Sequence, residues 1–108
     1  MSEEHDELLE EFEKKATGAR HVDVPLAVAT KFDGVERDSL RLRRPTAGDL
    51  IEMRETVKSG NQAEETLWLV ARCSGTNPKD LRQCDLADLD VCEAVLVGFR
   101  GARVARSA

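Results

Sequence analysis

Aromatic residues are scarce in this sequence, and the scarcity limits both the core and the function. Phe, Trp and Tyr make up 4% of the 108 residues, and Tyr is absent. The core must therefore be aliphatic, with Leu, Val and Ala packed around Trp68 and three Phe. Proteins that bind single-stranded nucleic acid stack bases on exposed rings, so this composition argues against such a platform.

Long apolar runs are also missing. No uncharged apolar stretch approaches the roughly 18 residues that a membrane span needs. Residues 2–13 are acidic, unlike the basic and then apolar start of a secretion signal. We therefore expect a cytoplasmic protein with no membrane contact.

Residues for catalysis or metal binding are few. Cys73, Cys84 and Cys92 follow one another at intervals of eleven and eight residues, which match no zinc module, and neither His5 nor His21 stands beside them. Gly-rich phosphate loops and a nucleophile-elbow serine are absent from the sequence. We expect buried structural thiols, no metal, no cofactor and no enzyme activity.

Negative charge is confined to one end of the chain. The formal net charge is −5, and residues 1–15 hold seven acids against Lys14 and Lys15. The remaining residues therefore balance to zero. A neutral body argues against a nucleic-acid binder, which must neutralise phosphates.

Residues 1–20 are predicted to form an acidic, flexible arm outside the domain. Leu8, Leu9 and Phe12 make a short apolar stripe in a helix-compatible run, which Thr17-Gly18 would end. A helix of this length is marginally stable in isolation, and we therefore expect a partly frayed arm. The alternative is a docking helix that folds on a partner through these apolar residues.

Residues 21–44 alternate between apolar and polar, which predicts a β-hairpin around Asp33-Gly34. A two-residue loop there would place Leu26 and Leu40 on opposite faces. We therefore expect a bulged, three-residue turn with Gly34 in the left-handed conformation and Leu26 opposite Leu40.

Helical patterns follow the hairpin. Thr46 is a good N-cap with Asp49 three residues on, and the helix after it should turn Ile51 inward with Met53 at its margin. Trp68 lies in the most apolar run and is expected to anchor the core. Helices are predicted over 47–58, 62–73, a short turn from Asn77-Pro78 through Leu81, and 86–99 with Leu86 inside.

These elements predict an α+β fold: an N-terminal antiparallel hairpin followed by three or four helices packed on one face. The expected organisation is an acidic arm at 1–20, a single domain at 21–100 and a flexible basic tail at 101–108.

Arg41, Arg43 and Arg44 form a basic cluster on the second strand. One interpretation is a solvated strand face that also protects a sheet edge from aggregation. The other is a docking surface for an acidic partner. The candidate partner-binding residues are therefore Arg41, Arg43, Arg44, Leu8, Leu9 and Phe12.

The stretch 40–50, Leu-Arg-Leu-Arg-Arg-Pro-Thr-Ala-Gly-Asp-Leu, resembles a phrase found in a known family. It is similar to the small tail assembly chaperones of long-tailed phages, particularly the Mu-like and P2-like contractile-tail group. The resemblance covers roughly residues 22–99, from a first strand containing Pro25 to a closing helix that follows Leu86-Ala87-Asp88-Leu89-Asp90.

The resemblance implies a protein outside the virion that binds the tape measure protein and helps to polymerise the tail tube around it, with the tail tube protein left open as a second partner. A homo-oligomer is left open. The competing hypothesis is a small regulatory or nucleic-acid-binding α+β protein, supported by the basic strand and by Arg100, Arg103 and Arg106 near the C-terminus.

Overall fold

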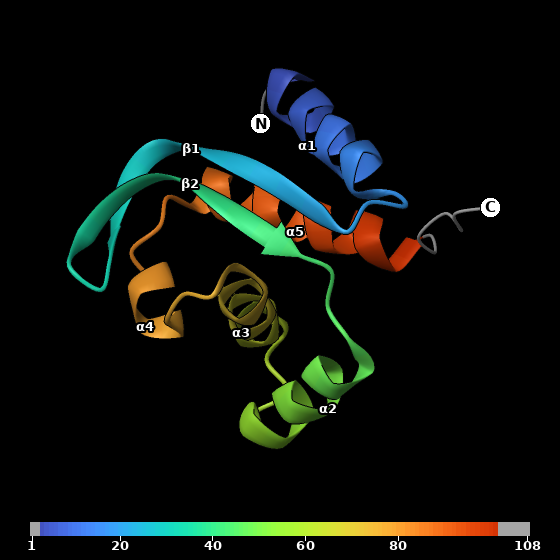
Figure 1. Ribbon diagram of the computed structural model, residues 1–108, viewed down its shortest axis with the longest axis vertical. Coiled ribbons are helices and arrows are strands. Elements are labelled where there is room, and N and C mark those ends of the chain that lie inside the picture. Colours follow the sequence, from blue (N-terminus) through green and yellow to red (C-terminus); the bar gives the residue numbers. More distant parts are fainter. Residues whose placement is uncertain (1–2, 102–108) are drawn as a thin grey trace.

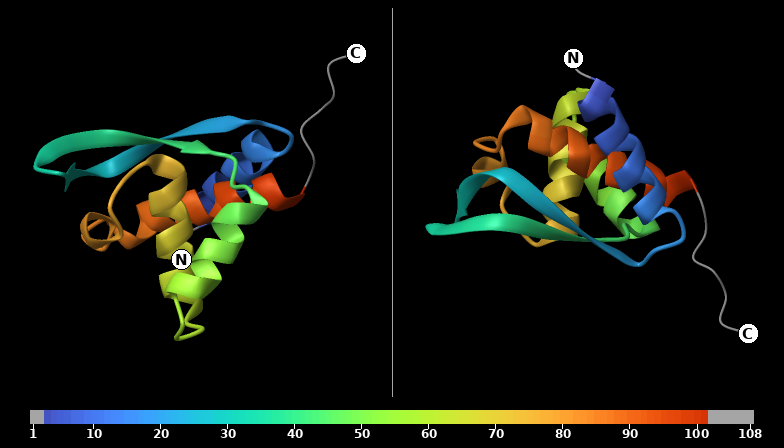
Figure 2. Two further views of the ribbon diagram at one scale, coloured as in Figure 1. Left: turned by 60° about the horizontal axis from the view of Figure 1, so that its bottom comes forward. Right: turned by 90° about the horizontal axis from the view of Figure 1, so that it is seen from above.

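A computed structural model describes residues 3–101, and it has the predicted α+β architecture of a hairpin followed by helices. Figure 1 shows the two strands lying across α5, and Figure 2 shows the hairpin as an outer layer with the helices on one side of it. The elements are, in order, α1 (Glu3–Ala16), β1 (His21–Phe32), β2 (Val35–Arg43), α2 (Ala47–Thr56), α3 (Gln62–Ser74), α4 (Pro78–Leu81) and α5 (Leu86–Gly101).

The hairpin turn is shorter than expected. Phe32 pairs directly with Val35, so Asp33 and Gly34 form a two-residue loop, and the predicted three-residue turn is wrong. Both loop residues have positive φ, 52° for Asp33 and 79° for Gly34. This is the backbone that a type I′ Asp-Gly turn requires, and its twist matches that of the strands.

With a two-residue turn, Leu26 and Leu40 would lie on opposite faces of the hairpin, and an irregularity in the middle of β1 prevents this. Pro25 pairs with Ser39 and Thr30 with Arg37, so four residues of β1 lie opposite a single residue of β2. β1 therefore has three more residues than β2 in this stretch. Because three is an odd number and successive side chains alternate between faces, the apolar residues of both strands return to one face. Val24, not Leu26, therefore lies opposite Leu40. The expected shared face is confirmed, because its four members are all buried: Val24, Leu26, Leu40 and Leu42.

Asp88 of α5 stabilises this irregular stretch. Its two carboxylate oxygens accept hydrogen bonds from the backbone N–H groups of Ala27 (3.0 Å) and Val28 (3.1 Å). These donors lie in the stretch where the regular ladder is interrupted. Asp88 is only 4% exposed, so α5 and β1 are joined by a buried, charge-assisted contact.

In α2 and in α5, an aspartate that points into the protein determines which side of the helix faces solvent. Thr46 and Asp49 form the predicted capping box of α2, and Asp49 points inward. Met53, four residues on, is therefore buried, whereas Ile51 is 58% exposed, opposite to the prediction. In α5, Asp88 faces inward, so Leu86 two residues earlier is 70% exposed rather than inside.

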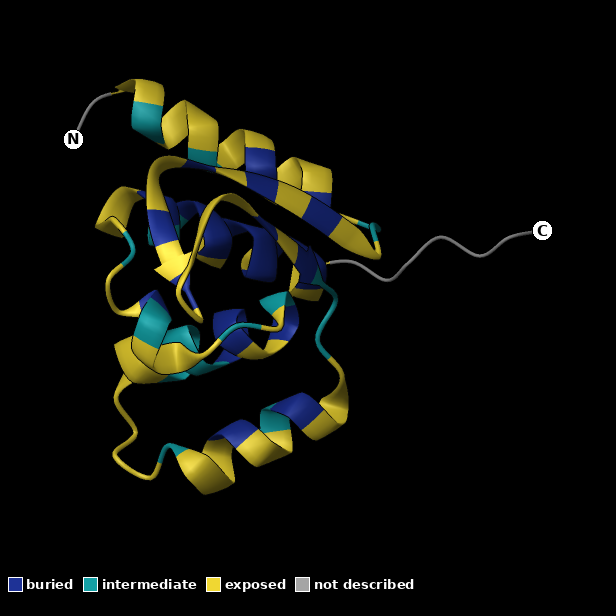
Figure 3. Cartoon of the chain, turned by 60° about the vertical axis from the view of Figure 1, so that its left-hand side comes forward, coloured by how far each residue is buried: buried dark blue, intermediate teal, exposed yellow. Residues whose placement is uncertain are grey.

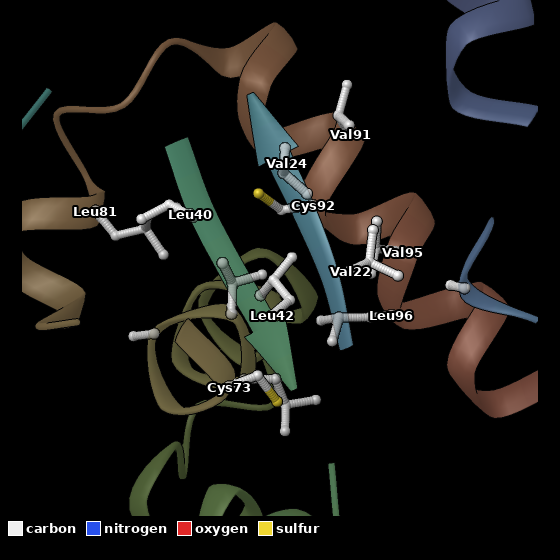
Figure 4. Packing of buried hydrophobic residues seen from close by; sticks show 14 of the residues in the cluster. Val22, Val24, Leu40, Leu42, Cys73, Leu81, Val91, Cys92, Val95 and Leu96 are labelled. Atoms are coloured by element: carbon white, nitrogen blue, oxygen red, sulfur yellow. The ribbon is translucent and has the colours of Figure 1, made fainter. Parts of the chain in front are cut away.

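The core lies between the hairpin and helices α3, α4 and α5. Figure 4 shows Val24 on β1 and Leu40 and Leu42 on β2 among side chains from these helices. The largest fully buried side chains are Leu40, Leu42, Leu81, Val24, Val70, Val95 and Cys92. The core is therefore aliphatic, as the composition requires.

The N-terminal residues differ from the expected frayed arm. Residues 3–16 form α1, which lies alongside α5 in Figure 1, and its inward face is buried in Figure 3. Phe12 and Ala16 are buried, at 4% and 0% exposure. The apolar stripe has a partner within the chain, which compensates for the weakness of a short helix. Of the expected tail at 101–108, Gly101 ends α5 and the rest lies outside the described residues.

Candidate partner-binding surface

The three arginines of the predicted cluster have different surroundings. Arg41 is solvated, with its Nε 4.0 Å from Asp23. Arg43 donates to both carboxylate oxygens of Asp49, at 2.7 and 3.2 Å. Arg44 lies just after β2 and donates to the backbone carbonyls of Ala19 and Phe99. Arg43 and Arg44 therefore join segments of the fold, and the three do not form one basic surface.

The Arg43–Asp49 pair connects the end of β2 to the start of α2. The Arg43 guanidinium, helped by the backbone N–H of Thr46, lowers the pKa of Asp49 to about 2, against the opposing effect of burial. Asp49 in turn raises the pKa of Arg43. The Pro-Thr-Ala-Gly-Asp phrase thus has a structural role, because its acid caps α2 and holds β2 in place.

This pair gives a pH-dependent contribution to stability. A carboxyl with a depressed folded-state pKa stabilises the fold above its unfolded pKa of about 3.9, and the contribution disappears as pH falls toward about 2. We expect the stability difference between the wild type and Asp49→Asn to be constant from neutral pH to about pH 4 and to shrink below it. Urea denaturation at each pH measures it, and a difference unchanged at pH 2.5 would contradict the assignment.

The N-terminal stripe is divided between core and surface. Leu8 is 38% exposed, Leu9 packs half-buried against the core, and Phe12 belongs to the core with the ammonium of Lys15 4.6 Å from its ring centre. The sequence-predicted stripe therefore meets α5, and only Leu8 of the three presents a large exposed area.

Helices α1 and α5 run parallel and very close together. His5, near the start of α1, lies 3.5 Å from Asp90, while Glu13 and Ala16 lie beside Gly98. A Cβ added at Gly98 would come within 2.2 Å of the Glu13 carbonyl oxygen and 2.7 Å of the Ala16 Cβ. The absence of a side chain at Gly98 therefore permits this approach of the two backbones.

Trp68 is half-buried at the surface, and the prediction that it anchors the core is wrong. The buried stripe of α3 runs through Leu69, Val70 and Cys73, which leaves Trp68 at its margin under the guanidinium of Arg72, 4.7 Å from the ring centre. Hollows of ≈ 260 Å³ and ≈ 300 Å³ flank the indole, and Pro78 lines both. Because all three Phe are buried, Trp68 is the aromatic side chain that a partner can reach.

A second hollowed region lies between α2, α3 and the end of α5. Leu69 and Arg100 line each of its three adjoining hollows, and Leu50 lines two of them. Its walls are mixed, with Glu65 and Glu93 beside the apolar side chains.

The cysteines are unsuited to nucleophilic chemistry. All three are free thiols, and burial raises the pKa of Cys73 and of Cys84 to about 11 and that of Cys92 to about 12. At neutral pH they are therefore protonated. Within residues 3–101, no group of three His, Cys, Asp or Glu side chains could hold a metal ion.

Among the described helices, none is both long and apolar enough to span a bilayer.

The fold and its surfaces define a small α+β domain with exposed apolar side chains and one accessible aromatic side chain, Trp68. The family model for phage tail assembly chaperone proteins, E, or 41 or 14, matches residues 23–101. This match covers well over half of the chain, so the chain belongs to that family of phage tail assembly chaperones. The match confirms the resemblance seen in the sequence. Comparisons with curated proteins and with solved structures gave no match.

Proposed function

We propose that this protein binds the tape measure protein of its phage in the host cytoplasm and assists assembly of the tail tube around it. The family match over residues 23–101, which includes the hairpin and helices α2 to α5, carries this proposal. The protein acts by contact with its client and turns over no substrate.

The chemistry of such a client fits the surface of this domain. A tape measure protein is long, helical and apolar along much of its length, so its exposed faces need cover until tube subunits arrive. Exposed apolar side chains lie on both strands and on three helices, each 38% or more accessible: Leu8, Val28, Val35, Ile51, Leu86 and Val97. Contacts spread in this way are individually weak and can be replaced by the tube protein.

Co-expression with the tape measure protein of the same phage tests the proposal. We expect the client to become more soluble and to co-elute with the chaperone on gel filtration. Unchanged client solubility with no co-eluting complex would refute it. Binding to duplex DNA that persists above roughly 0.2 M salt would instead favour a regulatory protein, because a contact made by a few arginines weakens strongly by then.

A further inference from the structure

We propose that the face of α5 covered by α1 is the docking surface for a helix of the client, and that α1 is a placeholder which this helix displaces. The inference rests on the proposed function and adds to it the location and chemistry of the contact.

The covered face is shaped for the backbone of a helix. At its centre, Gly98 lies so close to Glu13 that even a methyl group would overlap the α1 backbone. Val91 and Ala94, seven and four residues earlier, fall on the same side of α5 and are both buried. A helix with apolar residues spaced like Leu9, Phe12 and Ala16 therefore fits this face, as α1 demonstrates.

The chain is held to α5 just after α1, so this attachment can stay in place when the helix moves. Arg44 donates to the carbonyls of Ala19 and Phe99, so the chain is fixed to α5 immediately after the turn that ends α1. Gly18 in that turn has φ 76°, a left-handed conformation that suits a hinge. Within α1 itself only Phe12 and Ala16 are fully buried, and most of the helix surface is exposed (Figure 3).

The docking face on α5 and the helix α1 that covers it differ in their relation to the family match. The matched segment, residues 23–101, contains all of α5 and none of α1. The docking face thus belongs to the part shared with the family, whereas the helix that fills it here lies outside that part. In the complex a client helix would cover the apolar face of α5 in place of α1, so the face is shielded from water in both states.

Two substitutions on opposite sides of this contact should change client binding in opposite directions. Phe12→Ala weakens α1 alone, so the tape measure protein should bind roughly threefold more tightly or better. Gly98→Ala, added to Phe12→Ala, places a methyl group on the face when α1 competes only weakly for it, so binding should fall roughly tenfold below that of Phe12→Ala alone. Full-length tagged tape measure protein serves as the probe in a titration by biolayer interferometry.

Circular dichroism melts establish that each variant is folded, and Leu9→Ala replaces Phe12→Ala if the latter is not. If the α1 variant weakens binding or leaves it unchanged, the placeholder role is refuted. If Phe12→Ala/Gly98→Ala binds as tightly as Phe12→Ala alone, the docking face is refuted. A wild-type protein that forms no complex at all would instead refute the proposed function, so the two failures are distinguishable.

A reversible crosslink gives an independent test. His5→Cys and Asp90→Cys, in a Cys84→Ser background, place two thiols where the side chains now lie 3.5 Å apart across the contact. Joining them with a cleavable bis-maleimide should reduce client binding roughly tenfold, and cleavage should restore it. The matched control joins Asp23→Cys to Arg41→Cys, an exposed cross-strand pair within the hairpin. Full binding by the locked protein, or equal loss in the control, would overturn the inference.

Discussion

Leu42→Ala is expected to lower the free energy of unfolding by about 3–5 kcal/mol. Leu42 is fully buried, at 0% exposure, on the strand face that packs against the helices (Figure 4). Removal of three carbons there loses the transfer free energy of the side chain and leaves a cavity that a two-stranded sheet cannot close by itself. Since small domains are stabilised by about 5–15 kcal/mol in total, much of the fold's stability is at stake.

Urea denaturation followed by circular dichroism measures this loss. Leu86→Ala is the matched control, because it removes the same atoms from a side chain that is 70% exposed. The control should change stability by less than about 0.5 kcal/mol, as expected for surface sites. Equal losses for the two variants would show that Leu42 is not at the centre of the core.

Asp88→Ala should cost about 2–4 kcal/mol, because it removes the acceptor for two backbone donors. The N–H groups of Ala27 and Val28 donate to its two oxygens in the stretch where β1 departs from the regular ladder. Without Asp88, this stretch would lose its connection to α5, and the register that brings Val24 opposite Leu40 would lose its support.

A conservative variant separates hydrogen bonding from packing. Asp88→Asn keeps the shape and one acceptor oxygen, so it should recover roughly half of the loss. Asp23→Ala removes an exposed carboxylate whose side chain is 74% accessible, and it should be nearly neutral. Slowed amide hydrogen exchange at Ala27 and Val28 in the wild type, lost in Asp88→Ala, would localise the effect. Unchanged exchange in the variant would contradict the assigned role.

Local signals in the sequence were sufficient to predict the hairpin and the helices that follow it, in their order. Thr46 with Asp49 marked the start of α2, and Asn77-Pro78 marked α4, because caps are satisfied within a few residues of the chain. Asp33-Gly34 located the hairpin turn for the same reason. The predicted helices over 47–58, 62–73 and 86–99 differ from α2, α3 and α5 by at most two residues at either end.

The candidate surface was less accessible to sequence reasoning. The 40–50 phrase identified the family, yet two of its three arginines serve the fold, since Arg43 holds Asp49 and Arg44 holds Ala19 and Phe99. Gly98, which allows α1 to lie against α5, carries no signal of its own in the sequence. Its role depends on Glu13, a residue far away in the chain.

From the sequence alone one could predict, to within two residues, where helices α2, α3 and α5 begin and end, that the core is aliphatic, and that the apolar faces of the two strands require an odd correction in register. Where that correction lies, and which side of each helix turns inward, depends on contacts between distant segments. Asp88 holds the irregular part of β1 and so directs α5, while Arg43 holds Asp49 and so directs Met53 inward and Ile51 outward. Periodicity defines an apolar stripe, but the rotation of a helix is set by contacts with distant segments, which no local pattern contains.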